Sequence, residues 1–253
     1  MLIKFLTLNL LDGGIFFDNI TLFLKKEAPD IAVFQEVYNG QDPSLEPRLR
    51  TIARLQETLP DYQYHFAPTA TEILDGKKVP FGNAIFSRFP ITGSNIIFYD
   101  IPYDPHYVKA NKKGDFSKDP CNVQCVTLSV NGQGLHVFNT HGVWGLDGTD
   151  NERRFRMSEV IVSQIQNVAP AILAGDFNTQ PRTLAMQRIE EHLVNVFRNE
   201  LVSTFNMRHK TNPGYGAAVV DYIFVSPNIK VLDKACPDDD VSDHKPLLVT
   251  LEI

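Results

Sequence analysis

A carboxylate and a carboxamide, two residues apart, follow an apolar run near residue 175. The run Ala171–Ala174 is typical of a buried strand, and Gly175, Asp176, Phe177 and Asn178 come directly after it. Side chains alternate along an extended chain, so the side chains of Asp176 and Asn178 are expected to face the same way. Gly175 allows a sharp backbone turn and the close approach of a ligand. Such a pair suits a hydrated metal ion and a phosphate group, because Asn donates a hydrogen bond without adding negative charge.

Taken alone, this string has an equally good alternative, since an Asp followed by Asn often forms a turn or a helix cap. The rest of the chain favours the chemical interpretation, because six strand-like runs begin or end at polar residues of catalytic types. In chain order these are Asn9; Gln35 and Glu36; Asn139, Thr140 and His141; Asp176 and Asn178; Asp221; and Ser242, Asp243 and His244. Each one singly could be a turn residue, a surface carboxylate or a hydrogen-bonded core side chain. Together they indicate one site at the rim of a sheet.

This ordered set resembles the endonuclease/exonuclease/phosphatase superfamily, the group with the pancreatic deoxyribonuclease fold. The resemblance runs from residue 3 to residue 251, and its most specific strings are Gly-Asp-Phe-Asn at 175–178 and Ser-Asp-His at 242–244. It implies an α+β protein in which one catalytic domain covers residues 1–253. The implied fold is a four-layer α/β/β/α sandwich, with two mixed sheets packed face to face and the helices outside.

The resemblance also implies a divalent-metal-dependent phosphoester hydrolase in which water attacks phosphorus in line. The implied ligands of a Mg²⁺ or Mn²⁺ ion are Asn9, Glu36 and Asp243. The implied catalytic residues are His141, Asp176, Asn178, Asp221 and His244. In this assignment Asp176 orients or deprotonates the attacking water, Asn178 holds a phosphate oxygen, and the two histidines donate to the phosphate. Asp221 pairs with His244, fixes its tautomer and raises its pKa.

The chain departs from the family pattern at Leu11, where many relatives carry an acid two positions after the first-strand Asn. The nearest acid is Asp12, so a second metal site is in doubt. Relatives also place a phosphate-binding donor between the Glu and the His. The candidates for that donor are Asn83, Arg88, Tyr103 and Tyr107, and the sequence does not choose among them.

Composition limits the class of protein. At 253 residues and 43% hydrophobic content the chain can bury a sizeable core, and its net charge of −6 argues mildly against a non-specific DNA binder. Three cysteines make neither a disulfide framework nor a zinc motif. The first residues have the pattern of a core strand rather than a signal peptide, and no apolar run approaches the roughly 20 residues of a membrane span. We therefore expect a soluble, cytoplasmic monomer.

Periodicity and turn residues predict the elements that position the site. Helices are expected over 19–28 with Asp18 as cap, over 48–59, from a Thr149–Glu152 capping box to about 168, and over 183–192. Strands are expected near 62–67, 83–87 and 94–99. A hairpin is expected between 123–130 and 135–139, around the turn at 131–134. The stretch 100–120 is long, polar and irregular, and loops of this length are usually functional.

The substrate stays open at this stage. The irregular loop carries a possible nucleic-acid strip made of Lys109, Lys112, Lys113 and Lys118 with Tyr103, Tyr107 and Phe116. Its alternative is a plain charged surface loop. Arg153, Arg154 and Arg156 form a second possible phosphate-facing cluster, and Trp144 is a candidate for the cleft wall. The favoured hypothesis is a nuclease or other phosphodiesterase, followed by a phosphatase or phosphodiesterase acting on lipid head groups or small phosphoesters. A catalytically inactive binding module is disfavoured, because every expected catalytic residue type is present.

Overall fold

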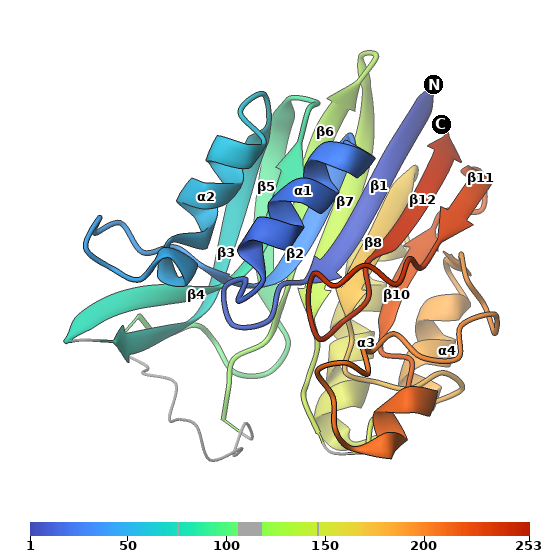
Figure 1. Ribbon diagram of the computed structural model, residues 1–253. Coiled ribbons are helices and arrows are strands. Elements are labelled where there is room, and N and C mark those ends of the chain that lie inside the picture. Colours follow the sequence, from blue (N-terminus) through green and yellow to red (C-terminus); the bar gives the residue numbers. More distant parts are fainter. Residues whose placement is uncertain (75, 106–117, 146) are drawn as a thin grey trace.

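Two six-stranded sheets pack face to face in the computed structural model (Figure 1), which describes residues 1–74, 76–105, 118–145 and 147–253. The first sheet has the order β11-β12-β1-β2-β4-β3, and the second has the order β5-β6-β7-β8-β10-β9. The strands of the first sheet are β1 (Leu2–Asn9), β2 (Ile31–Tyr38), β3 (Gln63–Leu74), β4 (Lys77–Ser87), β11 (Lys230–Ala235) and β12 (Leu247–Glu252). The strands of the second are β5 (Ile91–Phe98), β6 (Asn122–Val130), β7 (Gln133–His141), β8 (Ala171–Asp176), β9 (Val194–Asn195) and β10 (Asp221–Val225).

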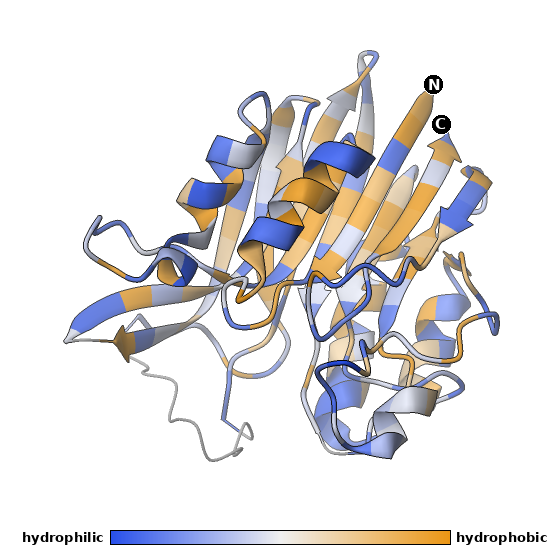
Figure 2. Ribbon diagram, in the orientation of Figure 1, coloured by the Kyte–Doolittle hydropathy of each residue, from blue (hydrophilic) through white to orange (hydrophobic). Residues whose placement is uncertain are grey.

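Alternation along the strands builds the layers. On β1, Ile3 and Phe5 point into the core between the sheets, where they join Val137 of β7 and Ile172 of β8. Leu6 and Leu8 point to the opposite face, where helices cover them. In Figure 2 the central strands are mainly hydrophobic, as expected for strands buried on both faces.

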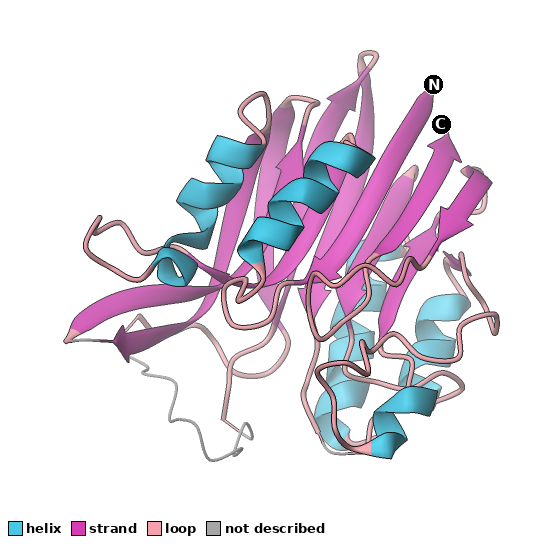
Figure 3. Ribbon diagram, in the orientation of Figure 1, coloured by secondary structure: helices cyan, strands magenta, loops and turns pink. Residues whose placement is uncertain are grey.

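Helices cover the two outer faces (Figure 3). α1 (Phe17–Glu27) and α2 (Thr51–Thr58) pack on the first sheet. α3 (Glu152–Ile165) and α4 (Leu184–Glu190) pack on the second. Two 3₁₀ turns, η1 (Pro47–Arg50) and η2 (Pro213–Ala217), complete the described elements. The four-layer sandwich of two mixed sheets expected from the sequence is therefore confirmed. Every helix in these ranges is too short or too polar to span a bilayer.

Two predicted helix caps are wrong. α1 begins at Phe17 without a side-chain cap, so Asp18 lies in its first turn. α3 is capped by Asn151, whose side chain accepts a hydrogen bond from the Arg154 backbone N–H, because the Thr149 hydroxyl is engaged with Asp147. The helix also ends at Ile165 rather than near 168. The presence of these helices could be predicted from their hydrophobic periodicity. The choice of capping residue depends on side-chain contacts outside the helix, which periodicity does not show.

The predicted hairpin between β6 and β7 is confirmed, with a tighter turn. β6 ends at Val130 and β7 starts at Gln133, so only Asn131 and Gly132 form the turn. Their φ angles are 51° and 79°, as a type I′ turn requires at both central positions. The turn sets the register of β6 against β7, and β7 pairs on its other side with β8, where His141 lies opposite Asp176.

Candidate active site

Strand register brings the predicted site residues to one edge of the sandwich. β1 and β2 are parallel and pair Asn9 with Gln35, next to Glu36. β7 and β8 are parallel and pair His141 with Asp176, and β10 pairs Asp221 with Asp176. Because parallel strands end at the same edge, polar side chains at their carboxyl ends converge.

Asp176 lies at the centre of this group and is almost fully buried. Its Oδ2 atom accepts a hydrogen bond from Asn9 Nδ2 at 3.1 Å. The same oxygen lies 3.5 Å from Nε2 of His141 and 3.8 Å from Nε2 of His244. A buried carboxylate therefore faces two imidazoles, which suits proton transfer beside an anionic ester.

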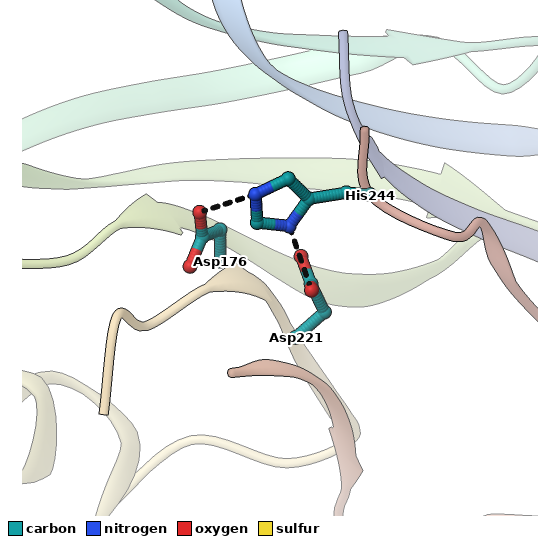
Figure 4. Close-up of side chains that lie close together, drawn as sticks. All are labelled: Asp176, Asp221 and His244. Carbon is teal, nitrogen blue, oxygen red and sulfur yellow. Dashed lines mark hydrogen bonds and ion pairs between the residues drawn. The ribbon is translucent and has the colours of Figure 1, made fainter. Parts of the chain in front are cut away.

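His244 bridges Asp176 and Asp221 (Figure 4). Its Nδ1 atom lies 2.9 Å from Oδ2 of Asp221, and its Nε2 atom faces Asp176. Burial opposes the charged imidazolium, but Asp221 and then Asp176 outweigh burial and raise the pKa of His244 to about 10. The proton on Nδ1 is thus held by Asp221, and Nε2 is directed into the site.

Glu36 sits where β2 departs from regular pairing. The register of β2 against β4 shifts between Phe34 and Val37, and Glu36 has a φ of 59°. Its carboxylate accepts hydrogen bonds from Asn9 Nδ2 at 3.1 Å and from the Asp12 backbone N–H at 2.7 Å. A bulge with positive φ at a non-glycine residue is a strained feature that is found preferentially at functional sites. Here it turns the carboxylate toward Asn9 and the cleft.

Asn9 links two carboxylates through its amide N–H₂ group. Its Oδ1 atom accepts from the backbone N–H of Leu11 at 3.0 Å, which fixes the orientation of the amide. Nδ2 consequently donates to both Glu36 and Asp176. Asn9 is therefore seen as a donor that holds the acids together, and its role as an oxygen ligand of a metal stays a prediction.

Asn178 and Gly175 lie beside Asp176, with contacts that the sequence did not predict. The backbone N–H of Asn178 donates to Asp176 Oδ1 at 2.9 Å, and its Nδ2 atom donates to the Gly142 carbonyl at 3.3 Å. Gly175 has a φ of 140°, and a Cβ there would lie 2.0 Å from the Thr140 carbonyl oxygen. Glycine is needed at this point for close packing against β7 rather than for a ligand.

Asp243 is engaged by Lys210, a residue that sequence reasoning missed. Lys210 Nζ lies 2.5 Å from Asp243 Oδ2. Burial opposes both charges, but His244 and Lys210 lower the pKa of Asp243, and Asp243 raises the pKa of Lys210. Lys210 belongs to the irregular segment before η2, where no hydrophobic period points to a fixed place. The only sequence signal is a lysine among aromatic residues between the Gly-Asp-Phe-Asn and Asp221 strings.

These side chains surround a cleft of about 420 Å³. Among the predicted residues, those that line it are Glu36, His141, Asp176, Asn178, Asp243 and His244. Trp144 lines the same cleft and is 38% exposed, so its predicted place on the wall is confirmed. Among the described residues that line the cleft, Lys210 is the only lysine and none is an arginine.

The acid groups can hold a divalent cation. Ligand atoms of Asp176, Asp221 and His244 lie within 4.8 Å of one another, all on buried residues. Glu36 adds a further carboxylate, joined to Asp176 through the Asn9 amide. In this group Asp221 is engaged by His244, so the hard ligands that suit a divalent ion are the carboxylate oxygens of Glu36 and Asp176. A cation would also offset the repulsion between buried acids.

The predicted arginine cluster does not face the cleft. Arg154 is fully buried and donates to the carbonyls of Val143, Gly145 and Thr149. Arg153 forms an ion pair with Asp100. The remaining member, Arg156, donates to the Tyr99 carbonyl and pairs with Glu159. Arg154 instead holds the loop that carries Trp144, so this one member of the cluster supports the cleft wall.

Of the four predicted donors between Glu36 and His141, the three that the structure describes are engaged elsewhere. Asn83 is fully buried and donates to Asn122 at 3.3 Å. Arg88 pairs with Asp30, and Tyr103 stacks on Phe98. Tyr107 and most of the lysine strip, Lys109, Lys112, Lys113 and Phe116, lie outside the described residues. Of that strip, Lys118 is described and exposed.

Comparison with known proteins agrees with this geometry. The model of the Endonuclease/Exonuclease/phosphatase family matches residues 6–244. The chain belongs to this family. Its members are phosphoester hydrolases that generally use divalent metal ions.

The individual relatives have low sequence identity to this chain. A UPF0294 protein of Vibrio vulnificus (strain YJ016) is 29% identical over 150 residues, which are 58% of this chain and 47% of that protein. The chain thus spans about half the length of the curated relatives it matches. A mannosyl-6-phosphatase from Bacteroides thetaiotaomicron VPI-5482 superposes with a TM-score of 0.73 at 20% identity, covering 99% of this chain and 100% of that one. TDP2 from D. rerio, solved with a single-strand DNA product, superposes with a TM-score of 0.68 at 17% identity, covering 100% and 99%. At these identities the solved structures share the fold.

Proposed function

We propose that the chain is a Mg²⁺- or Mn²⁺-dependent phosphoester hydrolase in which water attacks phosphorus in line. The observation that carries the proposal is the buried Asp176 carboxylate facing two imidazoles, with Oδ2 at 3.5 Å from His141 and 3.8 Å from His244. In-line hydrolysis needs a base for the attacking water and positive groups around the phosphoryl oxygens. Asp176 fits the first need, and the two histidines fit the second.

The ion would be held on the Glu36 side of the cleft. Glu36 supplies the first carboxylate, and Asp176 faces it across the Asn9 amide. A bound ion would polarise a phosphoryl oxygen and neutralise charge that gathers during the reaction. Asp243 was the third predicted ligand, and in the structure its Oδ2 atom is bound to Lys210.

The chain's own residues divide the remaining work. Asp176 orients the attacking water and accepts its proton, while Asn9 and the Asn178 backbone N–H fix the carboxylate. His244, protonated because Asp221 raises its pKa, directs Nε2–H into the site. His141, at the end of β7, adds a second donor. All these groups are held before substrate arrives, which is the condition for effective electrostatic stabilisation.

For the substrate we propose a phosphodiester, with nucleic acid as the first candidate. Trp144, partly exposed on the cleft wall, offers a face on which a base could stack. Sharing a fold with TDP2, solved with a single-strand DNA product, supports testing this class.

A second candidate is a small phosphomonoester. The described cleft lining contains a single lysine, and the chain has a net charge of −6. A negative net charge and a cleft with a single lysine disfavour a long polyanion relative to a small ester. Sharing a fold with a mannosyl-6-phosphatase supports testing this class too.

Two measurements test the proposal. Hydrolysis in H₂¹⁸O should place the label in the phosphoryl product, because water attacks phosphorus, whereas label in the alcohol product would refute in-line attack at phosphorus. Salt dependence separates the substrate classes: a polyanion should lose affinity steeply as salt rises, and a small ester should not.

A further inference from the structure

The ammonium group of Lys210 lies inside the cleft, among its acids. Nζ is 2.5 Å from Oδ2 of Asp243, and the side chain is 23% exposed. The ring centroids of Phe205 and Tyr215 lie 5.2 and 5.1 Å from Nζ, and the two rings pack together at 4.6 Å. A cation over two aromatic faces and beside a carboxylate is held in place from three sides.

The segment that carries Lys210 is anchored to the catalytic strand ends. Phe205 pairs with His244 as an isolated bridge, and their rings lie 4.5 Å apart. The backbone N–H of Asn206 donates to the Asp243 carbonyl at 2.8 Å. Nearby, the N–H of Lys245 donates to the Thr204 carbonyl at 2.7 Å. The position of Lys210 is therefore coupled to that of His244.

The acids of the site divide into two pairs by their partners. Asp221 is bound to His244, and Asp243 is bound to Lys210. Glu36 and Asp176 share the neutral amide of Asn9, which supplies no charge. Asp176 also faces the imidazoles of His141 and His244. Of these four acids, Glu36 is thus the one whose hydrogen-bond partners, the Asn9 amide and the Asp12 backbone N–H, are all neutral, and a cation from outside is expected on its side.

We propose that Lys210 is a substrate-binding residue that adds a positive charge, besides that of His244, on the Asp243 side of the site, where its ion pair keeps Asp243 from binding a second divalent ion. The inference rests on the phosphoester hydrolysis proposed above and names a further residue for it. One divalent ion would bind on the side of Glu36. An ammonium group has three N–H donors. Lys210 therefore donates one hydrogen bond to Asp243 and another to a phosphoryl oxygen.

The test uses the full-length chain and three variants. Lys210→Met keeps the aliphatic length against Phe205 and Tyr215 but removes the charge, and Lys210→Arg keeps the charge. Lys234→Met is a matched control, because Lys234 also pairs with an acid, Glu200, and lies over an aromatic ring, but does not line the cleft. Melting temperatures check that each variant is folded.

Binding is measured with two probes that need no turnover. Titration of the substrate-free protein with Mn²⁺ should give one ion per chain for the wild type. Inorganic phosphate, added to the Mg²⁺-loaded protein, should bind Lys210→Met at least about tenfold more weakly than the wild type, as expected for a lost charged hydrogen bond. Lys210→Arg should keep most of the phosphate affinity, and Lys234→Met all of it.

Two outcomes would overturn the inference: a wild type that binds two Mn²⁺ ions per chain, or a folded Lys210→Met variant that binds phosphate as tightly as the wild type. Failure of the proposed hydrolysis would show separately, as a wild type that binds one ion and phosphate but turns over no phosphoester.

Discussion

Nδ1 of His244 lies 2.9 Å from Oδ2 of Asp221, and both side chains are buried. Asp221 comes from the start of β10 and His244 from the segment before β12, so the pair joins the two sheets at the site. The contact fixes which nitrogen of His244 faces Asp176. A donor–acceptor pair of this kind controls the orientation and charge of a catalytic imidazole.

Asp221→Asn should lower kcat by about 10²–10⁴-fold, because the amide cannot stabilise the imidazolium or fix its tautomer. Steady-state kinetics with Mg²⁺ measure the effect. Asp233→Asn, at an exposed position of β11, serves as the control and should keep wild-type kcat. Equal kcat in the two variants would remove His244 from the proposed chemistry.

The same contact predicts a pH dependence of stability. The pKa of His244 is raised to about 10 in the folded chain, above the ordinary value of about 6.5. The stability that His244 adds to the folded chain is therefore fully present below about pH 6.5 and is lost as the pH rises through 10. The free energy of unfolding of wild type minus that of His244→Gln should fall over this window, by at most about 1.4 kcal/mol per pH unit. Urea denaturation in EDTA measures it, and a constant difference would contradict the raised pKa.

Chelation should stop the reaction, and Glu36 should control metal affinity. We expect EDTA to abolish hydrolysis and excess Mg²⁺ to restore it. Glu36→Gln, which keeps the shape but removes the charge, should raise the Mg²⁺ concentration needed for half-maximal rate at least about tenfold. Glu57→Gln, on the exposed face of α2, is the matched control. Unchanged Mg²⁺ dependence in Glu36→Gln would place the ion elsewhere.

Arg154 should matter for stability rather than for phosphate binding. Its guanidinium donates to three carbonyls of the loop that carries Trp144, and Arg154→Met would leave the buried Val143 carbonyl without this donor and remove the other two hydrogen bonds and the ion pair with Asp147. We expect a loss of roughly 3 kcal/mol in the free energy of unfolding. Arg156→Met, at a largely exposed side chain, should change it by less than about 0.5 kcal/mol. Similar effects of the two variants on urea denaturation would contradict this account of Arg154.

The sequence was sufficient for the layers and for the convergence of the strand ends. Alternating apolar residues, as in Ile3 and Phe5 against Leu6 and Leu8, specify a strand buried on both faces. Once β7 and β8 are parallel neighbours, His141 must come to Asp176. The buried strands follow from local pattern, whereas the two-sheet fold and the meeting of the strand ends were expected through the family resemblance, and the β7–β8 register comes from the structure.

The features that the sequence did not supply depend on long-range contacts of single side chains. Lys210 reaches Asp243 from an irregular segment, and no periodic pattern fixes where such a segment lies. Arg154 and its neighbours have the same charge whether they face a phosphate or protein carbonyls. The amide of Asn9 was expected to offer oxygen, but the nearby Leu11 N–H takes that oxygen and turns the nitrogen to the acids.

The most direct test of the account is turnover of a phosphoester panel by the wild type and by Asp176→Asn, each with Mg²⁺ and with EDTA. The panel contains plasmid, single-stranded DNA, RNA, inositol phosphates, phospholipids and bis-p-nitrophenyl phosphate. We expect the wild type to hydrolyse at least one ester with Mg²⁺ and none with EDTA, and Asp176→Asn, still folded, to be slower by about 10²–10⁴-fold. Asp176→Asn turnover at the wild-type rate, or a metal-loaded wild type that cleaves none of these esters, would contradict it.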